Sequence, residues 1–209
     1  MPFRLHTTIM PPHKHYSVTF AKASFPKDRE ISMELPGGPT QPEVMAVSLE
    51  KLGVRPGDIA ADIGCGTGTV TKAIAALTGA GGCVYAVDRR PAAVSITRET
   101  CAGLPQVEVF AGEALSFLSS PHKRIDCAFC GGSRDIAAVI ARLDEEGCRS
   151  IVVNAVLIET AVDTIHAMQE RGIFREAVHL QVSRSYELTE RIMFKPINPI
   201  YIIHGGHEC

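Results

Sequence analysis

The stretch DIGCGTG, residues 62–68, is the feature that most constrains the fold of this chain. It joins a short apolar run to an amphipathic run whose apolar residues recur at helical spacing. Glycine has no Cβ, so a loop with Gly64, Gly66 and Gly68 can turn sharply and let a ligand approach the backbone. The first amide groups of the following helix then face that ligand. The sequence therefore predicts a strand, a ligand-binding loop and a helix in immediate succession.

Short apolar segments alternate with amphipathic ones through most of the chain. We expect strands at 59–63, 83–87, 107–110, 125–130 and 151–156. Two of the helices expected between and after them have apolar faces made of Val70, Ala73, Ile74 and Leu77, and of Ile136, Val139, Ile140 and Leu143. Repeated strand–helix units predict an α/β fold, in which helices cover both faces of a mostly parallel sheet.

The two ends of the chain are less regular. Residues 1–24 carry prolines and histidines without apolar periodicity, and we interpret them as a mobile N-terminal arm before one domain at 25–209. Thr40 and Glu43 have capping-box spacing before a helix expected to reach about residue 52. Near the other end, the segments 192–194 and 200–204 are predicted to form a terminal hairpin pair.

Composition excludes several classes of protein. The formal net charge of −2 leaves no basic footprint for nucleic acid, and no apolar run reaches membrane-spanning length. The seven cysteines are an odd number and are scattered, which favours reduced thiols over a disulfide framework. Cys127 and Cys130 form a CxxC pair on a predicted strand, so we expect buried structural thiols on opposite faces. We expect a cytoplasmic protein that acts on a small molecule, with no bound metal.

The glycine pattern distinguishes between two classes of cofactor. A dinucleotide site reads GxGxxG, but here the third glycine comes one position early and Thr69 stands where that pattern wants Gly or Ala. Asp62 ahead of the glycines also lies outside that pattern. D-x-G-x-G-x-G instead resembles the first motif of the class I methyltransferases that use S-adenosylmethionine (SAM). A carboxylate at this strand end can hold the cationic amino-acid part of SAM. The alternative interpretation is a structural glycine turn.

Two further strand ends fit the same cofactor. Asp88 closes the second strand, where a carboxylate accepts hydrogen bonds from ribose hydroxyls; the alternative is a helix cap before Pro91. The segment AGEA follows the third strand. Glu113 and Ala114 in it are expected to flank the adenine, unless the segment is an ordinary loop.

Several blocks together resemble the family of cobalt-precorrin-6B carbon-15 methyltransferases (decarboxylating) and the C-terminal half of precorrin-6Y methyltransferase. The blocks are PGGPTQPEV, DIGCGTGTVT, VYAVDRRPAAV, GEA, CGGS, VNAVLIET, LQVSRSYEL and NPIYIIHGG. The resemblance implies the class I SAM-dependent methyltransferase (Rossmann-like) fold, with a mostly parallel seven-stranded sheet and an antiparallel terminal strand. It carries the cofactor role to Thr40, Gly64, Cys65, Gly66, Thr67, Gly68, Asp88 and Ala114. Thr40 thus has two interpretations, a helix cap or a SAM contact.

The resemblance also implies the chemistry. The family methylates a precorrin ring carbon and removes the carboxyl of an acetate side chain in cobalamin biosynthesis, and its members tend to form homotetramers. Substrate carboxylates suit arginines, so Arg89, Arg134 and Arg184 are candidates, with solvent-facing side chains as the alternative. Glu159 is a further candidate, although an acidic residue also suits a helix N-terminus. The chain departs from the family at Arg134 and Asp135, where glycines are usual, and at Glu113, which replaces Asp.

Two other functions remain open from the sequence. One is a class I methyltransferase that acts on RNA or protein, although the chain has no Trp and no basic excess. The other is a nucleotide-binding module without catalysis. The intact glycines and the two carboxylates at 62 and 88 argue against the second.

Overall fold

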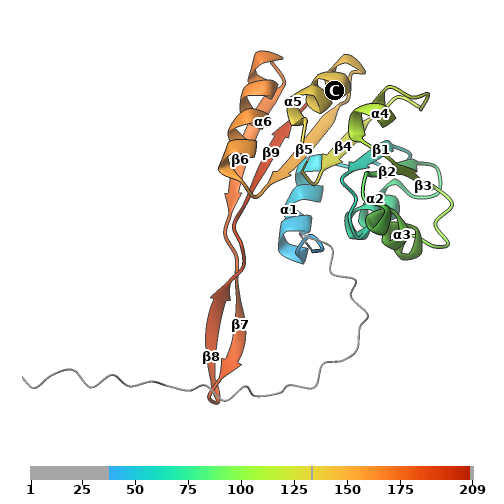
Figure 1. The fold of residues 1–209 in the computed structure, drawn as a ribbon. Helices are drawn as coiled ribbons and strands as arrows, with labels where there is room; N and C mark the ends of the chain where they lie inside the picture. Colours follow the sequence, from blue (N-terminus) through green and yellow to red (C-terminus); the bar gives the residue numbers. More distant parts are fainter. Residues whose placement is uncertain (1–37, 133, 208–209) are drawn as a thin grey trace, which may run out of the picture. The chain divides into compact units, whose positions relative to one another are not determined.

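A seven-stranded sheet with the order β3-β2-β1-β4-β5-β9-β6 organises the protein (Figure 1). The computed structural model describes residues 38–132 and 134–207, so the arm predicted at 1–24 and the domain start at 25 lie outside the described residues. The strands of this sheet are β1 (Ile59–Ile63), β2 (Cys83–Asp88), β3 (Val107–Ala111), β4 (Cys127–Cys130), β5 (Ser150–Ala155), β6 (Phe174–Leu180) and β9 (Ile200–Gly205). The helices are α1 (Pro42–Leu52), α2 (Thr69–Thr78), α3 (Pro91–Thr100), α4 (Ala114–Leu118), α5 (Ile136–Glu145) and α6 (Ile158–Glu170).

The sheet is mostly parallel, as predicted. β1 pairs in parallel with β2 and β4, and the parallel pairing continues to β3 on one side and to β5 on the other. β9 runs antiparallel to both of its neighbours, β5 and β6. The order of strands reverses direction between β1 and β4, which is where open α/β sheets bind their ligands, beyond the carboxyl ends of the strands.

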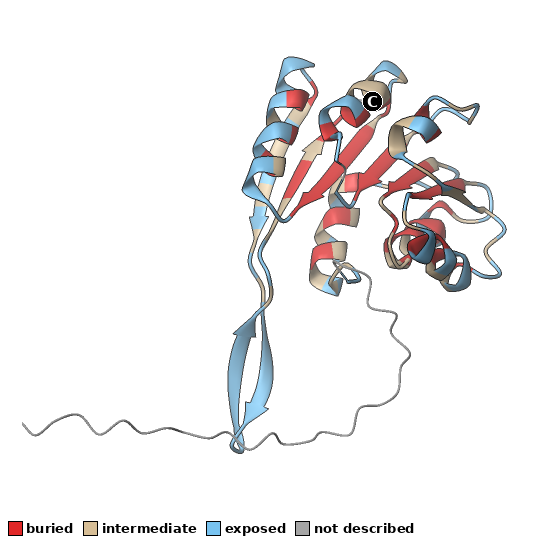
Figure 2. Cartoon of the chain, viewed as in Figure 1, coloured by how far each residue is buried: buried red, intermediate tan, exposed pale blue. Residues whose placement is uncertain are grey.

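Apolar side chains from successive strand residues go to opposite faces of the sheet and form two cores. The central strands consist of buried residues along most of their length (Figure 2). On one face, Phe129 and neighbouring strand residues pack against Val44 of α1 and Ile74 of α2. On the other, strand residues pack against Phe117, Ile140 and Met168 from α4, α5 and α6. Central strands are therefore buried on both sides, which explains why their sequences read as continuous apolar runs.

The C-terminal prediction is wrong in its pairing. Residues 192–194 and 200–204 are strands, but they do not pair with each other. β8 (Arg191–Pro196) pairs with β7 (Ser183–Leu188) in a separate two-stranded ribbon, whereas β9 joins the main sheet. Strand identity follows from local composition, but the choice of partner depends on contacts far away in the sequence. The ribbon extends from the ends of β6 and β9 beyond the sheet (Figure 1).

Two smaller expectations also fail. Leu77 was expected on the buried face of α2, but its side chain is 44% exposed, and Ala75 and Thr78 are buried instead. The strand expected at 125–130 begins at residue 127. Within the described part of the chain, no helix is long and apolar enough to cross a membrane.

Candidate functional site

The glycine loop lies against the carboxyl end of β2. The amides of Gly64 and Cys65 both donate to the carbonyl of Val87, at 2.8 and 3.1 Å. Gly64, Gly66 and Gly68 have φ of 84°, 57° and 75°, the left-handed region that glycine adopts without strain. The loop therefore needs its glycines for backbone conformation, as the sequence indicated.

Threonines of α3 hold this loop in place. Thr97 Oγ1 donates to the carbonyl of Gly66 at 3.1 Å, and Thr100 Oγ1 donates to that of Thr67 at 2.8 Å. Sequence reasoning missed both threonines, because a helical threonine gives no sign of the loop that it will meet. These two bonds attach the glycine loop to α3.

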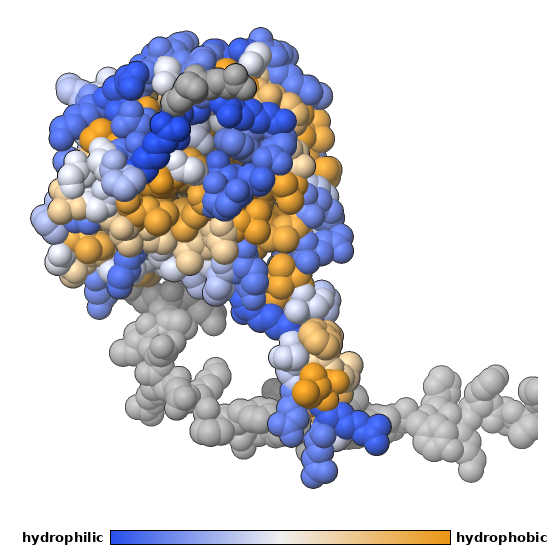
Figure 3. Space-filling view, turned by 180° about the vertical axis from the view of Figure 1, so that it is seen from behind, coloured by the Kyte–Doolittle hydropathy of each residue, from blue (hydrophilic) through white to orange (hydrophobic). Residues whose placement is uncertain are grey.

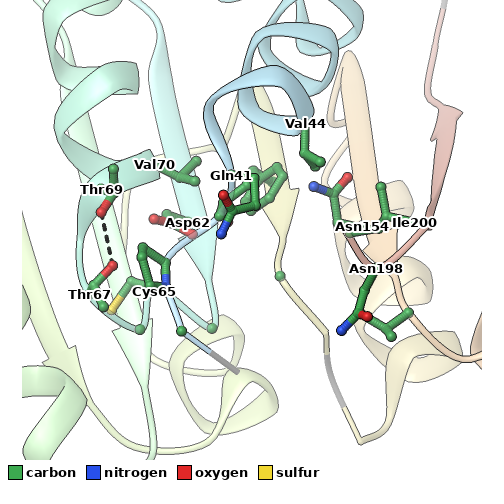
Figure 4. A pocket seen from close by; sticks show the side chains of 18 of the residues that line it. Gln41, Val44, Asp62, Cys65, Thr67, Thr69, Val70, Asn154, Asn198 and Ile200 are labelled. Carbon is green, nitrogen blue, oxygen red and sulfur yellow. Dashed lines mark hydrogen bonds between the residues drawn. The ribbon is translucent and has the colours of Figure 1, made fainter. Parts of the chain in front are cut away.

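Two adjoining hollows lie at this edge of the sheet and share Gly64, Arg90 and Gly131 in their walls. The larger, of about 510 Å³, lies between the glycine loop and the start of α1 (Figure 4). Figure 4 shows Asp62 and Cys65 on one wall, with Asn154 and Asn198 on the opposite one. The smaller, of about 240 Å³, lies between the ends of β2 and β3. The predicted cofactor residues divide between the two, except Gly68, which lines neither.

Asp62 is the buried acid of the larger hollow. Thr71 Oγ1 of α2 donates to Asp62 Oδ2 at 2.5 Å, while Oδ1 has no hydrogen-bond partner among the described residues. Burial raises the pKa of Asp62 to about 7, against the lowering effect of the Thr71 bond. An unpartnered buried acceptor in a ligand-sized hollow fits a cationic donor group, such as the ammonium of an amino acid.

The raised pKa of Asp62 predicts a pH-dependent stability. The folded state keeps a proton that the unfolded carboxyl, with its ordinary pKa of 3.8, has already lost. The free energy of unfolding should therefore fall as pH rises from about 4 to about 7, by at most about 4 kcal/mol. Asp62→Asn, which is neutral throughout, should match the wild type at about pH 3 and exceed its stability at about pH 8 in urea unfolding. Equal stability of the two at both pH values would contradict this.

Asp88 closes β2 in the smaller hollow. Its Oδ2 accepts from the Gly66 amide at 3.1 Å, and its Oδ1 accepts from the Arg90 amide at 2.9 Å. Burial alone would raise its pKa, but the hydrogen bonds from Arg90 and Gly66 outweigh burial and lower it, so the carboxylate is ionised. The N-cap of α3 is Arg90 rather than Asp88, so the helix-cap interpretation is wrong.

Glu113 and Ala114 line the smaller hollow together with Asp88, as expected for residues flanking one nucleoside. Arg89 lies there too, and its Nη1 is 3.7 Å from Glu113 Oε1. Ala114 is the first residue of α4. This grouping is consistent with the prediction for both residues, whose contact with adenine remains a prediction.

Thr40 lies in the wall of the larger hollow, next to the start of α1. The capping interpretation is wrong, because the N-cap is Gln41 and no side chain caps the helix. Cys65 and Thr67 line the same hollow, and Thr67 Oγ1 lies 2.9 Å from Thr69 Oγ1 (Figure 4). The pKa of the Cys65 thiol is raised to about 12, mainly by burial and to a smaller extent by the nearby Asp62. The thiol therefore stays protonated and is not a nucleophile.

Sequence reasoning missed Asn154 and Asn198 on the far wall. Asn154 is 6% exposed; its Oδ1 accepts from Ser48 Oγ at 3.0 Å, and its Nδ2 has no partner among the described residues. A polar residue in the middle of the apolar strand VVNAV was the signal that could have found it. The hollow thus offers an unpartnered acceptor, Asp62 Oδ1, and an unpartnered donor, Asn154 Nδ2.

The candidate catalytic residues are not brought together. Arg134 lines the smaller hollow. Arg184 lies on β7, where its Nε donates to Glu43 Oε1 of α1 at 2.9 Å, and it lines neither hollow. Glu159 is exposed in the first turn of α6 and also lies outside both linings. Of these three, Arg134 is the one placed to meet a ligand.

The CxxC pair is structural, as predicted. Cys127 packs in one core and Cys130 in the other, both fully buried and free. Burial raises both thiol pKa values. Among the described residues, no group of His, Cys, Asp and Glu is arranged to hold a metal ion.

Comparisons with known proteins agree with this geometry. The family model described as "Precorrin methyltransferase domain" matches residues 34–205. A probable cobalt-precorrin-6B C(15)-methyltransferase (decarboxylating) from Methanosarcina acetivorans is 48% identical over 177 residues, 83% of this chain and 96% of that protein.

Solved structures agree as well. A precorrin 8W decarboxylase from Methanobacterium thermoautotrophicum superposes with a TM-score of 0.74 at 30% identity, over 81% of this chain and 92% of the other. A precorrin-6Y C5,15-methyltransferase from Geobacter metallireducens superposes with a TM-score of 0.73 at 28% identity, over 80% of this chain and 90% of the other. Aeropyrum pernix fibrillarin with bound SAM shares the fold alone. Its sequence is 16% identical, and it superposes with a TM-score of 0.59 over 77% of this chain and 73% of the other. The fold is that of class I SAM-dependent methyltransferases, and the chain belongs to the precorrin methyltransferase family.

Proposed function

We propose that this protein transfers a methyl group from SAM to carbon 15 of cobalt-precorrin-6B and removes the carboxyl group of an acetate side chain, a reaction of cobalamin biosynthesis. The observation that carries the proposal is the 48% identity to the Methanosarcina acetivorans protein over 96% of that protein's length, since that protein is named for this reaction. The site described above supports it independently, because its hollows suit a nucleoside and a cationic amino acid.

The residues present fit SAM. The ionised Asp88 carboxylate suits ribose hydroxyls, and Glu113 and Ala114 lie beside it in the smaller hollow. Asp62 and Thr40 line the larger hollow, where Asp62 Oδ1 suits an ammonium. Residues 64–67 line the larger hollow, and Gly64 lines both. When bound, SAM supplies a methyl group on a positively charged sulfur.

The chain's own residues contribute placement rather than covalent chemistry. The Cys65 thiol beside the site is held protonated, and an electron-rich ring carbon needs no activating base. The conjugated macrocycle can absorb the electrons that carbon dioxide leaves behind. The rate enhancement therefore comes from alignment of the two reactants and exclusion of water. Asn154 and Asn198 lie where they can position a substrate in the larger hollow.

Two measurements test this function. Calorimetry should show that S-adenosylhomocysteine binds and that NADH does not. Mass spectrometry of products from cobalt-precorrin-6B should show one added methyl group together with the loss of carbon dioxide. A methylated product that keeps every carboxyl would overturn the decarboxylation, and the absence of methyl transfer would overturn the substrate.

The protein is further proposed to be a cytoplasmic homotetramer in which β7 and β8 form the contact between copies. Ile192 and Phe194 on this ribbon are 75% and 67% exposed, and the paired Tyr186 and Met193, whose positions alternate with theirs along the strands, are 41% and 43% exposed. The space-filling view shows apolar side chains at the surface of the ribbon (Figure 3). A two-stranded ribbon cannot bury both of its faces by itself. A second copy of the same ribbon would cover them. The buried free thiols suit a reducing compartment.

The ribbon contact predicts a change of assembly on substitution. Ile192→Ser with Phe194→Ser should convert the tetramer to smaller species, measured by light scattering after size-exclusion chromatography. Leu77→Ser, which removes an exposed apolar side chain from α2, is the matched control and should leave the mass unchanged. A tetramer that survives the double substitution would place the interface elsewhere.

A further inference from the structure

The guanidinium of Arg90 covers the Asp88 carboxylate. Its Nε donates to Oδ1 at 3.0 Å and its Nη2 donates to Oδ2 at 2.8 Å. The backbone amide of Arg90 also donates to Oδ1, and that of Gly66 also donates to Oδ2. A carboxylate offers about four acceptor positions in total, so those of Asp88 are filled.

A ribose that binds Asp88 must therefore replace some of these donors. The two amides are fixed by the backbone of the loop and of the helix start. The guanidinium is not fixed in this way, because the Arg90 side chain is 37% exposed while that of Asp88 is 4% exposed. The guanidinium is carried by a side chain that solvent reaches, so it can leave Asp88 while the two backbone amides stay in place.

The released guanidinium has a second place to go. Arg90 lines the larger hollow as well as the smaller one, and its Nη2 lies 3.7 Å from the point where a Cβ on Gly66 would be. It thus stands on the boundary between the nucleoside side and the side with room for a substrate. A planar guanidinium binds a carboxylate through two parallel hydrogen bonds, and a precorrin carries many carboxylates.

We propose that Arg90 exchanges partners during the reaction: ribose binding displaces it from Asp88, and it then binds a carboxylate of the tetrapyrrole. The cofactor consequently binds first and completes the anion site for the substrate. This inference rests on the proposed function, because it needs both a ribose on Asp88 and a polycarboxylate substrate. It assigns Arg90 a positioning role that sequence reasoning gave to Arg89, Arg134 and Arg184.

The test uses the full chain, Arg90→Gln, and, as a control, Arg98→Gln, an exposed arginine of α3 that lines neither hollow. The probe is uroporphyrin, a fluorescent tetrapyrrole polycarboxylate, titrated with and without saturating S-adenosylhomocysteine. In the wild type the nucleoside should tighten porphyrin binding about tenfold, and porphyrin should tighten nucleoside binding by the same factor. Arg90→Gln should lose this coupling, whereas Arg98→Gln should keep it.

Calorimetry supplies the second readout. Arg90→Gln should bind S-adenosylhomocysteine as tightly as the wild type or up to about fivefold more tightly, because a competing ion pair is gone. A tenfold loss would show that the guanidinium belongs to the nucleoside site and would overturn the proposal. So would coupling that persists in Arg90→Gln, or a wild type whose porphyrin binding the nucleoside does not tighten. A wild type that binds no nucleoside at all would instead refute the proposed function. Circular dichroism confirms that each variant is folded.

Discussion

Asp88→Ala should bind S-adenosylhomocysteine about a hundredfold more weakly than the wild type in calorimetry. The substitution removes the ionised carboxylate that we propose as the acceptor for ribose hydroxyls, and each hydrogen bond to a charged group contributes about 1.5–3 kcal/mol. It also removes the acceptor for the Gly66 amide, which helps to hold the glycine loop. Asp88→Asn, which keeps the shape and one acceptor oxygen, should lose about tenfold.

The control for charge is Glu99→Gln, an exposed residue of α3 that lines neither hollow. It removes one negative charge without touching the site, so its affinity should equal that of the wild type. If Asp88→Ala still binds within about threefold of the wild type, the nucleoside does not lie on Asp88 and the division of the cofactor between the two hollows is wrong.

Gly68→Ala should destabilise the fold by about 2–4 kcal/mol and weaken nucleoside binding. Gly68 has a φ of 75°, which costs an L-residue about 1–2 kcal/mol. A Cβ there would lie 3.0 Å from Thr97 Cα and 3.1 Å from Thr97 Cγ2. Thr97 is fully buried and bonded to the carbonyl of Gly66, so it has little freedom to move away. Urea unfolding measures the stability, and calorimetry measures the binding.

Gly53→Ala separates the two parts of this effect. Gly53 ends α1 with a φ of 58°, and the nearest atom to its Cβ position is 4.0 Å away, at the end of the Arg149 side chain. It should therefore lose only about 1–2 kcal/mol from backbone strain and bind nucleoside normally. Equal losses of stability in the two variants would mean that the contact with Thr97 carries no cost.

Most of the central sheet was predictable because burial leaves a direct mark on sequence. β1 has the predicted bounds, and the apolar residues expected on α5 are all buried. Asp62 and Asp88 were found because a strand that is apolar throughout ends at a defined residue, and the topology brings such ends together. The prediction from periodicity was wrong at Leu77. The spacing of apolar residues shows which face of a helix is apolar, but it does not show how much of that face the neighbouring elements cover.

What could not be predicted depends on contacts between distant residues. Nothing near residues 192–194 specifies pairing with β7 in place of β9, because both candidate partners have strand-like composition. Arg90 was not among the arginines that the sequence singled out, and its contact with Asp88 depends on how the fold brings the strand end and the helix start together. Asn154 was visible as a polar residue in an apolar strand, but its unpartnered Nδ2 became evident only when α1 was packed over it.

The ribbon also bears on how the chain reaches its native topology. β6 lies at the edge of the sheet and is held there by β9, which enters between β5 and β6 as the last strand in the chain. The segment between them closes on itself through a short-range hairpin, so zipping of β7 to β8 brings the following residues next to β6 at small loop-closure cost. β9, the last strand along the chain, therefore reaches its place between β5 and β6 already paired with β6. Shortening the turn or unpairing the ribbon would slow refolding even where the final stability is unchanged.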